Sequence, residues 1–211
     1  MTSRPRSTPY LSADRLTLAR GDAPVCRNLS MRLLPGECVH LHGPNGSGKT
    51  SLMQALCGLL RPEGGAVDWH GASPRHALHY CAHQNALKSA WTVAENLAWQ
   101  LRLHGCPVRP AQWETPLAQM RLEHLADIPA AQLSQGEQRR AALMKLALMP
   151  RPVWLLDEPF NALDTAAREC LSEWINRHVL DDGAVLFSSH SGQPASLQLS
   201  RRISLETEGR A

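Results

Sequence analysis

The chain has 211 residues, of which 43% are hydrophobic and 19% are charged, and its formal net charge is +3. This length suffices for one packed α/β domain, or for one domain with a small helical insertion. No apolar run approaches the ~18 residues that a membrane-spanning helix needs, so no segment is expected to cross a bilayer by itself. The mild charge and the lack of a Lys/Arg block give no support for a nucleic-acid partner.

The start of the chain is polar, contains Pro5 and Pro9, and lacks the apolar core of a signal peptide. We therefore expect residues 1–10 to form a flexible cytoplasmic tail and residues 11–211 to form a single domain. Six cysteines are scattered without a C-x-x-C pair, a pattern that predicts buried free thiols rather than a disulfide framework.

Alternating apolar and polar residues predict two half-buried strands, at residues 15–19 and 29–34. A third, short strand at residues 38–42 leads directly into residues 43–50, which read Gly-Pro-Asn-Gly-Ser-Gly-Lys-Thr. This is an unbroken G-x-x-x-x-G-K-[ST] pattern, in which glycines allow positive φ angles and backbone N–H groups turn inward around an anion. A helix is predicted to start at Thr50, with its dipole directed at the phosphates.

The pattern of this loop predicts that its ligand is a nucleoside triphosphate. Lys49 can reach the outer phosphates, and the Thr50 hydroxyl can coordinate Mg²⁺. The alternative, an idle glycine-rich turn, does not account for the strand before the loop and the helix after it. The predicted ATP-binding residues of the loop are Gly43, Pro44, Asn45, Gly46, Ser47, Gly48, Lys49, Thr50 and Ser51.

The stretch from about residue 92 to residue 150 is rich in helical patterns and is predicted to form an inserted helical subdomain. Its first helix begins with a capping box at Thr92 and is expected to end at Pro107 and Pro110. The predicted helices cover residues 93–103, residues 111–126 approximately, and the stretch from after Ser134 to Met149.

Strands alternate with helices on both sides of this subdomain, which predicts an α/β core. Before the subdomain, residues 78–81 read as a short strand. After it, residues 153–157 are a continuous apolar run that ends in an acid, as in a strand buried on both faces of a parallel sheet. A helix at 165–180, a second buried strand at 184–188 and at most one more strand around 203–205 complete the pattern.

Two further motifs carry chemistry. Asp157 can hold Mg²⁺ next to Thr50, and Glu158 can orient and polarise an attacking water as a general base. Alternatively, this acid pair only caps the next turn. Ser134 and Gly136 stand at a helix start, where N–H groups and a hydroxyl can bind a second anion. A Ser134 that merely caps its helix is the open alternative.

Six motifs in order resemble those of the ATP-binding domain of the ABC family, over nearly the whole chain. They are GPNGSGKT, His83-Gln84, LSQGEQ, VWLLDEP, Asn161-Ala-Leu-Asp164 and Ser189-His190. The resemblance implies an α/β fold with a P-loop NTPase core of the ABC ATPase type, an inserted helical subdomain and an N-terminal antiparallel β subdomain. It also implies a Mg-dependent ATPase with ATP and Mg²⁺ as cofactors.

The same resemblance implies roles for single residues. Gln84 would sense Mg²⁺ and water, Asp164 would lie at a dimer interface, and His190 would contact the γ-phosphate. The implied catalytic residues are Glu158, His190 and Gln84. The implied Mg²⁺ site uses Thr50, Gln84 and Asp157. The implied signature, which contacts the ATP bound by the other subunit, consists of Ser134, Gln135, Gly136 and Glu137.

The resemblance implies partners as well. Each ATP would lie between the loop 43–50 of one copy and the helix start 134–138 of a second copy, so that neither copy alone completes the site. A two-fold symmetric homodimer follows. A membrane-spanning partner is expected to dock near Gln84. The six tryptophans are expected to serve mainly in packing, and of these Trp91 and Trp99 are the ones expected to contact the partner.

Two positions depart from the family pattern. Where the family usually has an aromatic residue that stacks on adenine, this chain has Arg20, whose guanidinium can also stack on a base. Position 135 is Gln where the family mostly has Gly, which is expected to alter how tightly the dimer closes.

Within the family, the chain most resembles the ATP-binding subunits of the haem exporters of cytochrome c maturation. The resemblance lies in residues 43–52, 83–97 and 138–143 and in the missing adenine-stacking aromatic. That resemblance implies an ATPase motor at the cytoplasmic face of the bacterial inner membrane, with haem handled by multi-span membrane subunits. Two alternatives stay open: an ATPase subunit for another cargo, and a soluble ABC protein that acts on nucleic acid. The ten histidines lack metal-ligand spacing and are expected to be solvated or hydrogen-bonded rather than haem ligands.

Overall fold

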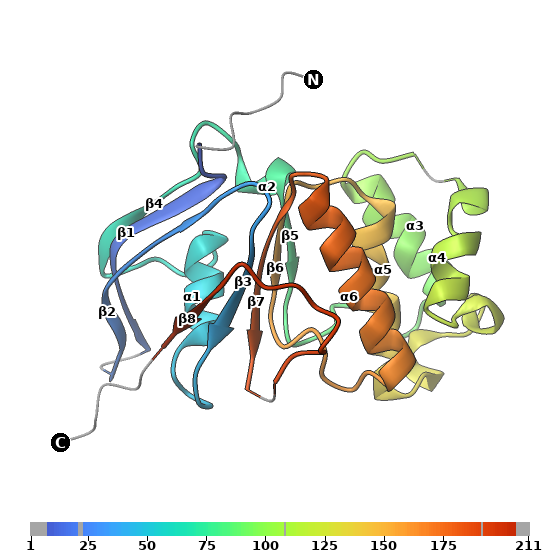
Figure 1. Cartoon of the computed structure of the whole chain (residues 1–211). Coiled ribbons are helices and arrows are strands. Elements are labelled where there is room, and N and C mark those ends of the chain that lie inside the picture. The colour runs from blue at the N-terminus through green and yellow to red at the C-terminus, as the bar shows by residue number, and fades with distance from the viewer. Residues whose placement is uncertain (1–7, 21–22, 108, 191, 206–211) are drawn as a thin grey trace.

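The computed structural model describes residues 8–20, 23–107, 109–190 and 192–205. Within these residues, a three-stranded antiparallel sheet lies beside a five-stranded parallel sheet, and helices pack around the parallel sheet (Figure 1). This arrangement confirms the predicted α/β fold with an antiparallel subdomain. Residues 1–7 of the predicted flexible tail lie outside the described residues.

The antiparallel sheet consists of β1 (Leu11–Arg20), β2 (Ala23–Leu33) and β4 (Gly64–Asp68), in the order β2-β1-β4. β1 and β2 overlap the two strands predicted from alternation. β4 was not predicted, because it begins with two glycines, which are weak strand formers. A Cβ at Gly65 would collide with the carbonyl oxygens of Asp14 and Arg15 on β1, so glycine permits the close approach of the two strands here.

The parallel sheet places the ends of its strands at a common edge. Its strand order is β5 (Leu78–Cys81), β6 (Val153–Leu156), β7 (Ala184–Ser189), β3 (Cys38–His42) and β8 (Arg201–Ser204). β6 and β7 are buried along their whole length, as their continuous apolar sequences predict. Because all neighbouring strands run parallel, the segments that follow β3, β5, β6 and β7 meet at the carboxyl edge of the sheet.

The helices are α1 (Lys49–Leu56), α2 (Pro74–Ala77), α3 (Val93–Leu103), α4 (Glu114–Gln119), α5 (Gln135–Leu148) and α6 (Thr165–Leu180), with 3₁₀ turns at Pro110–Gln112, Glu123–Leu125 and Ala130–Gln132. Two hydrophobic cores lie on opposite faces of the parallel sheet. Leu155 belongs to the core that includes α1 and the antiparallel sheet, whereas Leu156 belongs to the core that includes α3, α5 and α6. Figure 1 shows α1 between the two sheets and α3 to α6 on the other side.

The predicted helix 93–103 is confirmed as α3, including its capping box at Thr92. Its end at Leu103 also matches the predicted bound, but the two prolines that were expected to end the helix lie beyond the turn that ends it. Gly105 takes a φ of 67°, and the Cys106 N–H donates to the Leu101 carbonyl at 2.8 Å. This is a Schellman motif, in which glycine in the left-handed conformation reverses the chain.

The predicted helix at about 111–126 was wrong in extent, since only α4 is α-helical there. Arg121 takes a φ of 54°, and the Leu122 N–H donates back to the Leu117 carbonyl at 2.9 Å. The turn buries Met120 and Leu122 completely. The apolar residues of this stretch are therefore buried by a compact series of turns and do not form one face of a single helix.

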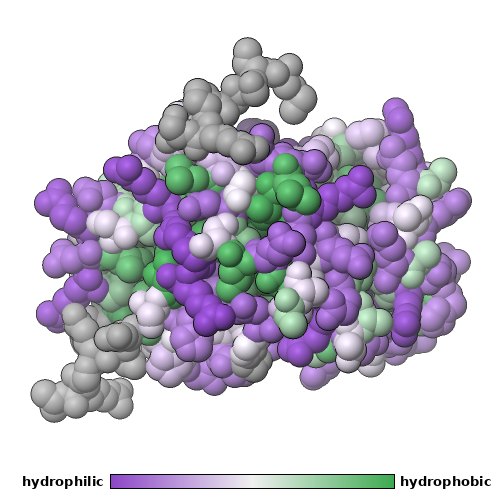
Figure 2. Space-filling view, viewed as in Figure 1, coloured by the Kyte–Doolittle hydropathy of each residue, from purple (hydrophilic) through white to green (hydrophobic). Residues whose placement is uncertain are grey.

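No helix in the described part of the chain is long and apolar enough to cross a membrane. On the face shown in Figure 2, hydrophobic residues gather in small patches between hydrophilic ones. The six cysteines are free thiols, as predicted, and three of them are buried while three are half-buried. Burial raises the pKa of Cys38 to about 12, so this thiol stays protonated at neutral pH.

Candidate active site

The loop at residues 43–50 connects β3 to α1 and owes its path to its glycines. Gly46 and Gly48 have φ angles of 85° and 92°, which side chains of L-residues rarely adopt. A methyl group on Gly48 would also collide with the side chain of Val25 on β2. α1 begins at Lys49, one residue before the predicted start, so its N-terminus opens onto the loop.

Lys49 places a cation inside this loop. Its ammonium donates to the carbonyl oxygens of Gly43 at 2.7 Å and of Pro44 at 2.9 Å. The side chain is buried, with 6% of its residue surface exposed. An anion bound by the loop would therefore meet a cation that neutral carbonyl oxygens already hold in place.

Asp157 and Thr50 lie 107 positions apart in the sequence and are brought together by the fold. The Thr50 hydroxyl donates to one Asp157 carboxylate oxygen at 2.7 Å, and the Ser188 hydroxyl on β7 donates to the other at 2.6 Å. Asp157 is buried, at 1% exposure. Sequence reasoning missed Ser188, because a serine in a buried strand carries no signal until the neighbouring strand is known.

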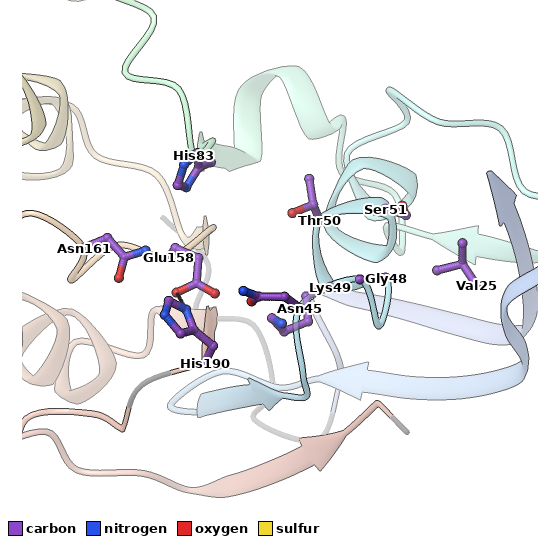
Figure 3. Close-up of a pocket in the computed structure, with 11 residues that line it drawn as sticks. Val25, Asn45, Gly48, Lys49, Thr50, Ser51, His83, Glu158, Asn161 and His190 are labelled. Atoms are coloured by element: carbon purple, nitrogen blue, oxygen red, sulfur yellow. Dashed lines mark hydrogen bonds and ion pairs between the residues drawn. The ribbon is translucent and has the colours of Figure 1, made fainter. Parts of the chain in front are cut away.

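Glu158 and His190 form a second pair, which Figure 3 shows facing the loop across the cavity. A Glu158 carboxylate oxygen lies 3.0 Å from Nδ1 of His190. The Glu158 N–H donates to the Ser188 hydroxyl at 2.9 Å. Glu158 has a φ of 49°, an uncommon and strained conformation for a residue other than glycine. The carboxylate is thus aimed by a backbone geometry that its neighbours must maintain.

These groups enclose a cavity of about 310 Å³ at the carboxyl edge of the sheet (Figure 3). The cavity is lined by predicted residues of the loop and by the predicted Glu158 and His190. It is also lined by Val25, His83 and Asn161, which had not been predicted as site residues. His83 and Asn161 stand inside the motifs that were recognised, but no role had been given to them. The full lining is Val25, Asn45, Gly46, Gly48, Lys49, Thr50, Ser51, His83, Glu158, Asn161 and His190.

Gln84 does not line this cavity. It lines an adjoining cavity of about 540 Å³, which Glu158 and Asn161 also border and which reaches Gln135 at the start of α5. His83, one residue earlier, occupies the place next to the loop. A contact between Gln84 and a metal ion therefore stays a prediction.

The start of α5 carries the predicted second anion site. The Ser134 hydroxyl accepts from the Glu137 N–H at 3.3 Å, and the Glu137 carboxylate accepts from the Ser134 N–H at 2.7 Å. These hydrogen bonds with Ser134 hold the pKa of Glu137 below its usual range. Ser134 therefore does cap its helix, but a hydroxyl that accepts one bond can still donate another to an anion. None of the residues 134–137 lines the cavity at the loop.

Two contacts connect α5 with the loop at residues 161–164. A Cβ on Gly136 would lie 2.7 Å from the Ala162 carbonyl oxygen, so this glycine permits close packing. The Asp164 carboxylate caps α6 by accepting from the Ala167 N–H at 2.8 Å, and it lies 3.4 Å from the Arg140 guanidinium. The Asp164 side chain is 51% exposed, so it stays accessible to a second molecule.

Arg20 is the last residue of β1, and its side chain lies outside the described part of the structure. Its stacking on a base therefore stays a prediction. Val25 on β2 does line the cavity, so the antiparallel sheet contributes an apolar side chain to the site. No sequence signal marked this residue, because it reaches the cavity only through the packing of β2 on the loop.

Comparison with known proteins agrees with this geometry. The family model described as ABC transporter matches residues 26–161. A solved structure titled as the ATP-binding subunit of an ABC transporter is 26% identical, has a TM-score of 0.77, and is matched over 86% of this chain and 80% of its own. An ATP-binding protein from Pyrococcus furiosus, 24% identical over 92% of this chain and 96% of its own, has a TM-score of 0.80 and supports the fold.

Curated relatives of this chain carry the name cytochrome c biogenesis ATP-binding export protein CcmA, among them the three that follow. The protein from Alkalilimnicola ehrlichii is 43% identical over 87% of this chain and 81% of its own length. The protein from Bordetella bronchiseptica is 41% identical over 85% and 84%, respectively. The protein from Rhizobium johnstonii is 40% identical over 93% and 94%.

Proposed function

Because this chain belongs to the ABC transporter family, we propose that it is the ATP-hydrolysing subunit of a membrane complex that exports haem for cytochrome c maturation. The observation that carries the ATPase part is the cavity that joins the loop 43–51 to Glu158 and His190. The cytochrome c part rests on the CcmA relatives, whose names combine cytochrome c biogenesis with export.

The loop supports binding of ATP through its phosphates. Its N–H groups, the start of α1 and the Lys49 ammonium all favour an anion there. The neighbouring residues fit Mg²⁺, because the Thr50 hydroxyl and the Asp157 carboxylate lie 2.7 Å apart and this ion prefers oxygen ligands. Thr50 and Asp157 would hold the ion, with Gln84 as the third expected residue. Bound Mg²⁺ supplies neutralisation of charge on the outer phosphates.

Glu158 is proposed as the general base that orients the attacking water. One carboxylate oxygen lies 3.0 Å from His190, which leaves the other oxygen free to accept the proton of a water. The Glu158 side chain is only 12% exposed, whereas that of His190 is 43% exposed. His190 can therefore hold Glu158 and still reach toward the γ-phosphate at the mouth of the cavity.

A second copy of the chain is the proposed source of the remaining contacts. The start of α5, with Ser134 and Gln135 exposed, lies outside the cavity of its own chain. In a two-fold dimer, each Ser134 and Gly136 would contact the ATP on the partner copy's loop, and the exposed Asp164 would lie at the interface. The accessible helix start supports this arrangement.

The proposed partner is a multi-span membrane protein of a haem-handling complex, which would hold this subunit at the cytoplasmic face of the bacterial inner membrane. A groove of about 410 Å³ beside α3 supports such a contact, because Trp91 and Trp99 line it and Trp99 is 44% exposed. Their rings meet edge to face at 5.6 Å, and the Lys88 ammonium lies 4.4 Å above the Trp91 ring. An ATPase subunit of an ABC transporter for another cargo is the alternative.

The substitution Glu158→Gln tests the ATPase mechanism. Loss of a general base is expected to lower hydrolysis by about a hundredfold or more while ATP binding stays intact. An ATP-bound dimer should then accumulate, which size-exclusion chromatography with and without ATP would detect. Glu123→Gln, at an exposed carboxylate outside the cavity, is the matched control and should behave as wild type. Rapid hydrolysis by Glu158→Gln would remove Glu158 from its proposed role.

Co-purification tests the cargo. The tagged chain, extracted from membranes in mild detergent, is expected to bring down a multi-span membrane protein together with haem-handling subunits. Mass spectrometry of the eluate identifies the partner. Recovery of a permease for a metal ion or a peptide would reject the haem assignment and leave the ATPase assignment standing.

A further inference from the structure

Arg139, on the second turn of α5, is buried in the middle of the catalytic region, with 4% of its surface exposed. Its guanidinium donates to the carbonyl oxygens of Asp157 and Ala82 at 2.8 Å and of Glu158 at 2.9 Å. A further bond reaches the Asn85 side-chain oxygen at 3.2 Å. One side chain thus holds the segment after β6 and the segment after β5 at the same time.

The acceptors around Arg139 are neutral oxygens, so the burial of this charge is not explained by an ion pair. Burial lowers the pKa of the guanidinium, which marks the unfavourable removal of the cation from water. A buried charge is tolerated only when its donors are well satisfied. The planar fork of arginine supplies several donors in fixed directions, which a lysine ammonium cannot reproduce.

The carbonyls that Arg139 holds are those on which the aim of Glu158 depends. Glu158 has the strained φ of 49°, and such a conformation persists only when the surroundings determine it. Its N–H is held by Ser188 and its carbonyl by Arg139, so both sides of the residue are tied. The carbonyl of Asp157, one residue earlier, is held by the same guanidinium.

Arg139 also stands five residues after Ser134, which caps the same helix. Resting on the proposed function, we propose that Arg139 is a positioning residue. It couples two events in one copy of the chain: the contact of the start of α5 with the partner copy's ATP, and the orientation of the Glu158 carboxylate. A shift of α5 on engaging that ATP moves the guanidinium, and the guanidinium moves the carbonyls that flank the general base. Each site thereby responds to occupancy of the other.

The substitution Arg139→Lys tests the inference in the full-length chain with its membrane partners. Loss of the fork should misplace Glu158 and lower kcat by between about tenfold and a hundredfold. The KM for ATP should stay within about twofold, because the loop 43–51 is untouched. The Hill coefficient for ATP should fall toward 1, since the coupling between the two sites is lost. Asn85→Ala, which removes a single bond to the fork, should lower kcat and the Hill coefficient to a smaller extent.

Lys145→Met is the matched control on the same helix. It removes a cation whose ammonium donates to the Tyr80 carbonyl at 2.7 Å, away from Glu158. It should lower the Tm without a change in kcat or in the Hill coefficient. Wild-type kcat and Hill coefficient in both Arg139→Lys and Asn85→Ala would overturn the inference, as would an equal loss of kcat in Lys145→Met. The proposed function fails separately, through the Glu158→Gln test or through a wild-type complex that does not hydrolyse ATP.

Discussion

Acidification from pH 7.5 to pH 5.0 should destabilise this protein, and His79 on β5 should carry about 2 kcal/mol of the loss. His79 is buried, at 2% exposure, and its Nε2 donates to the Met149 carbonyl at 2.9 Å. Burial, aided by the nearby Lys145 and Arg151 cations, lowers its pKa from 6.5 to about 3. The hydrogen bond to Met149 only partly offsets that effect.

The sign follows from where the proton is bound. The unfolded chain takes up a proton on His79 below pH 6.5, whereas the folded chain does so only near pH 3. Stability is therefore fully present above the unfolded pKa of 6.5 and is lost progressively as the pH falls toward the folded pKa. At pH 5.0, 1.5 units below the unfolded value, the loss is about 2 kcal/mol, since each unit corresponds to about 1.4 kcal/mol.

Urea unfolding of the wild type and of His79→Gln, each at pH 7.5 and pH 5.0, measures this effect. The glutamine amide can donate to the Met149 carbonyl but does not titrate. The comparison at pH 7.5 gives the cost of the altered packing and serves as the control. The wild type should lose about 2 kcal/mol more than the variant on acidification. Equal losses in both proteins would refute the reasoning.

Two further substitutions test the site. Gly48→Ala should lower the affinity for ATP at least about tenfold by calorimetry, because its methyl collides with Val25 and its φ is 92°. Gly58→Ala is the control, with a φ of 76° and open space around it, and ATP affinity equal in the two variants would contradict the loop geometry. Ser188→Ala should cost about 1–3 kcal/mol in urea unfolding, because a carboxylate oxygen of Asp157 and the Glu158 N–H lose their partner. The same variant should lower kcat, and an unchanged kcat would show that Ser188 does not position Glu158.

Local chemistry made much of this fold predictable. The N-cap residues Thr92 and Ser134 indicate where α3 and α5 begin, since an N-cap side chain bonds to the backbone N–H three residues later. The glycines of the loop 43–50 predict its path as well, because the ability to adopt a positive φ is a property of single residues. The errors are also local. Gly105 ends α3 before the prolines do, and Arg121 interrupts a helical pattern by turning the chain.

The candidate active site likewise has one part that the sequence predicted and one part that only the fold determines. By itself, the sequence predicted a triphosphate-binding loop at residues 43–50 and placed Asp157 and Glu158 directly after a buried strand, because both features lie in contiguous residues. The tertiary structure decided which distant groups support them. Ser188 and Arg139 reach Asp157 across 31 and 18 positions of sequence, and they reach Glu158 across 30 and 19 positions. Such contacts depend on the strand order and on the packing of α5, which short-range patterns do not encode.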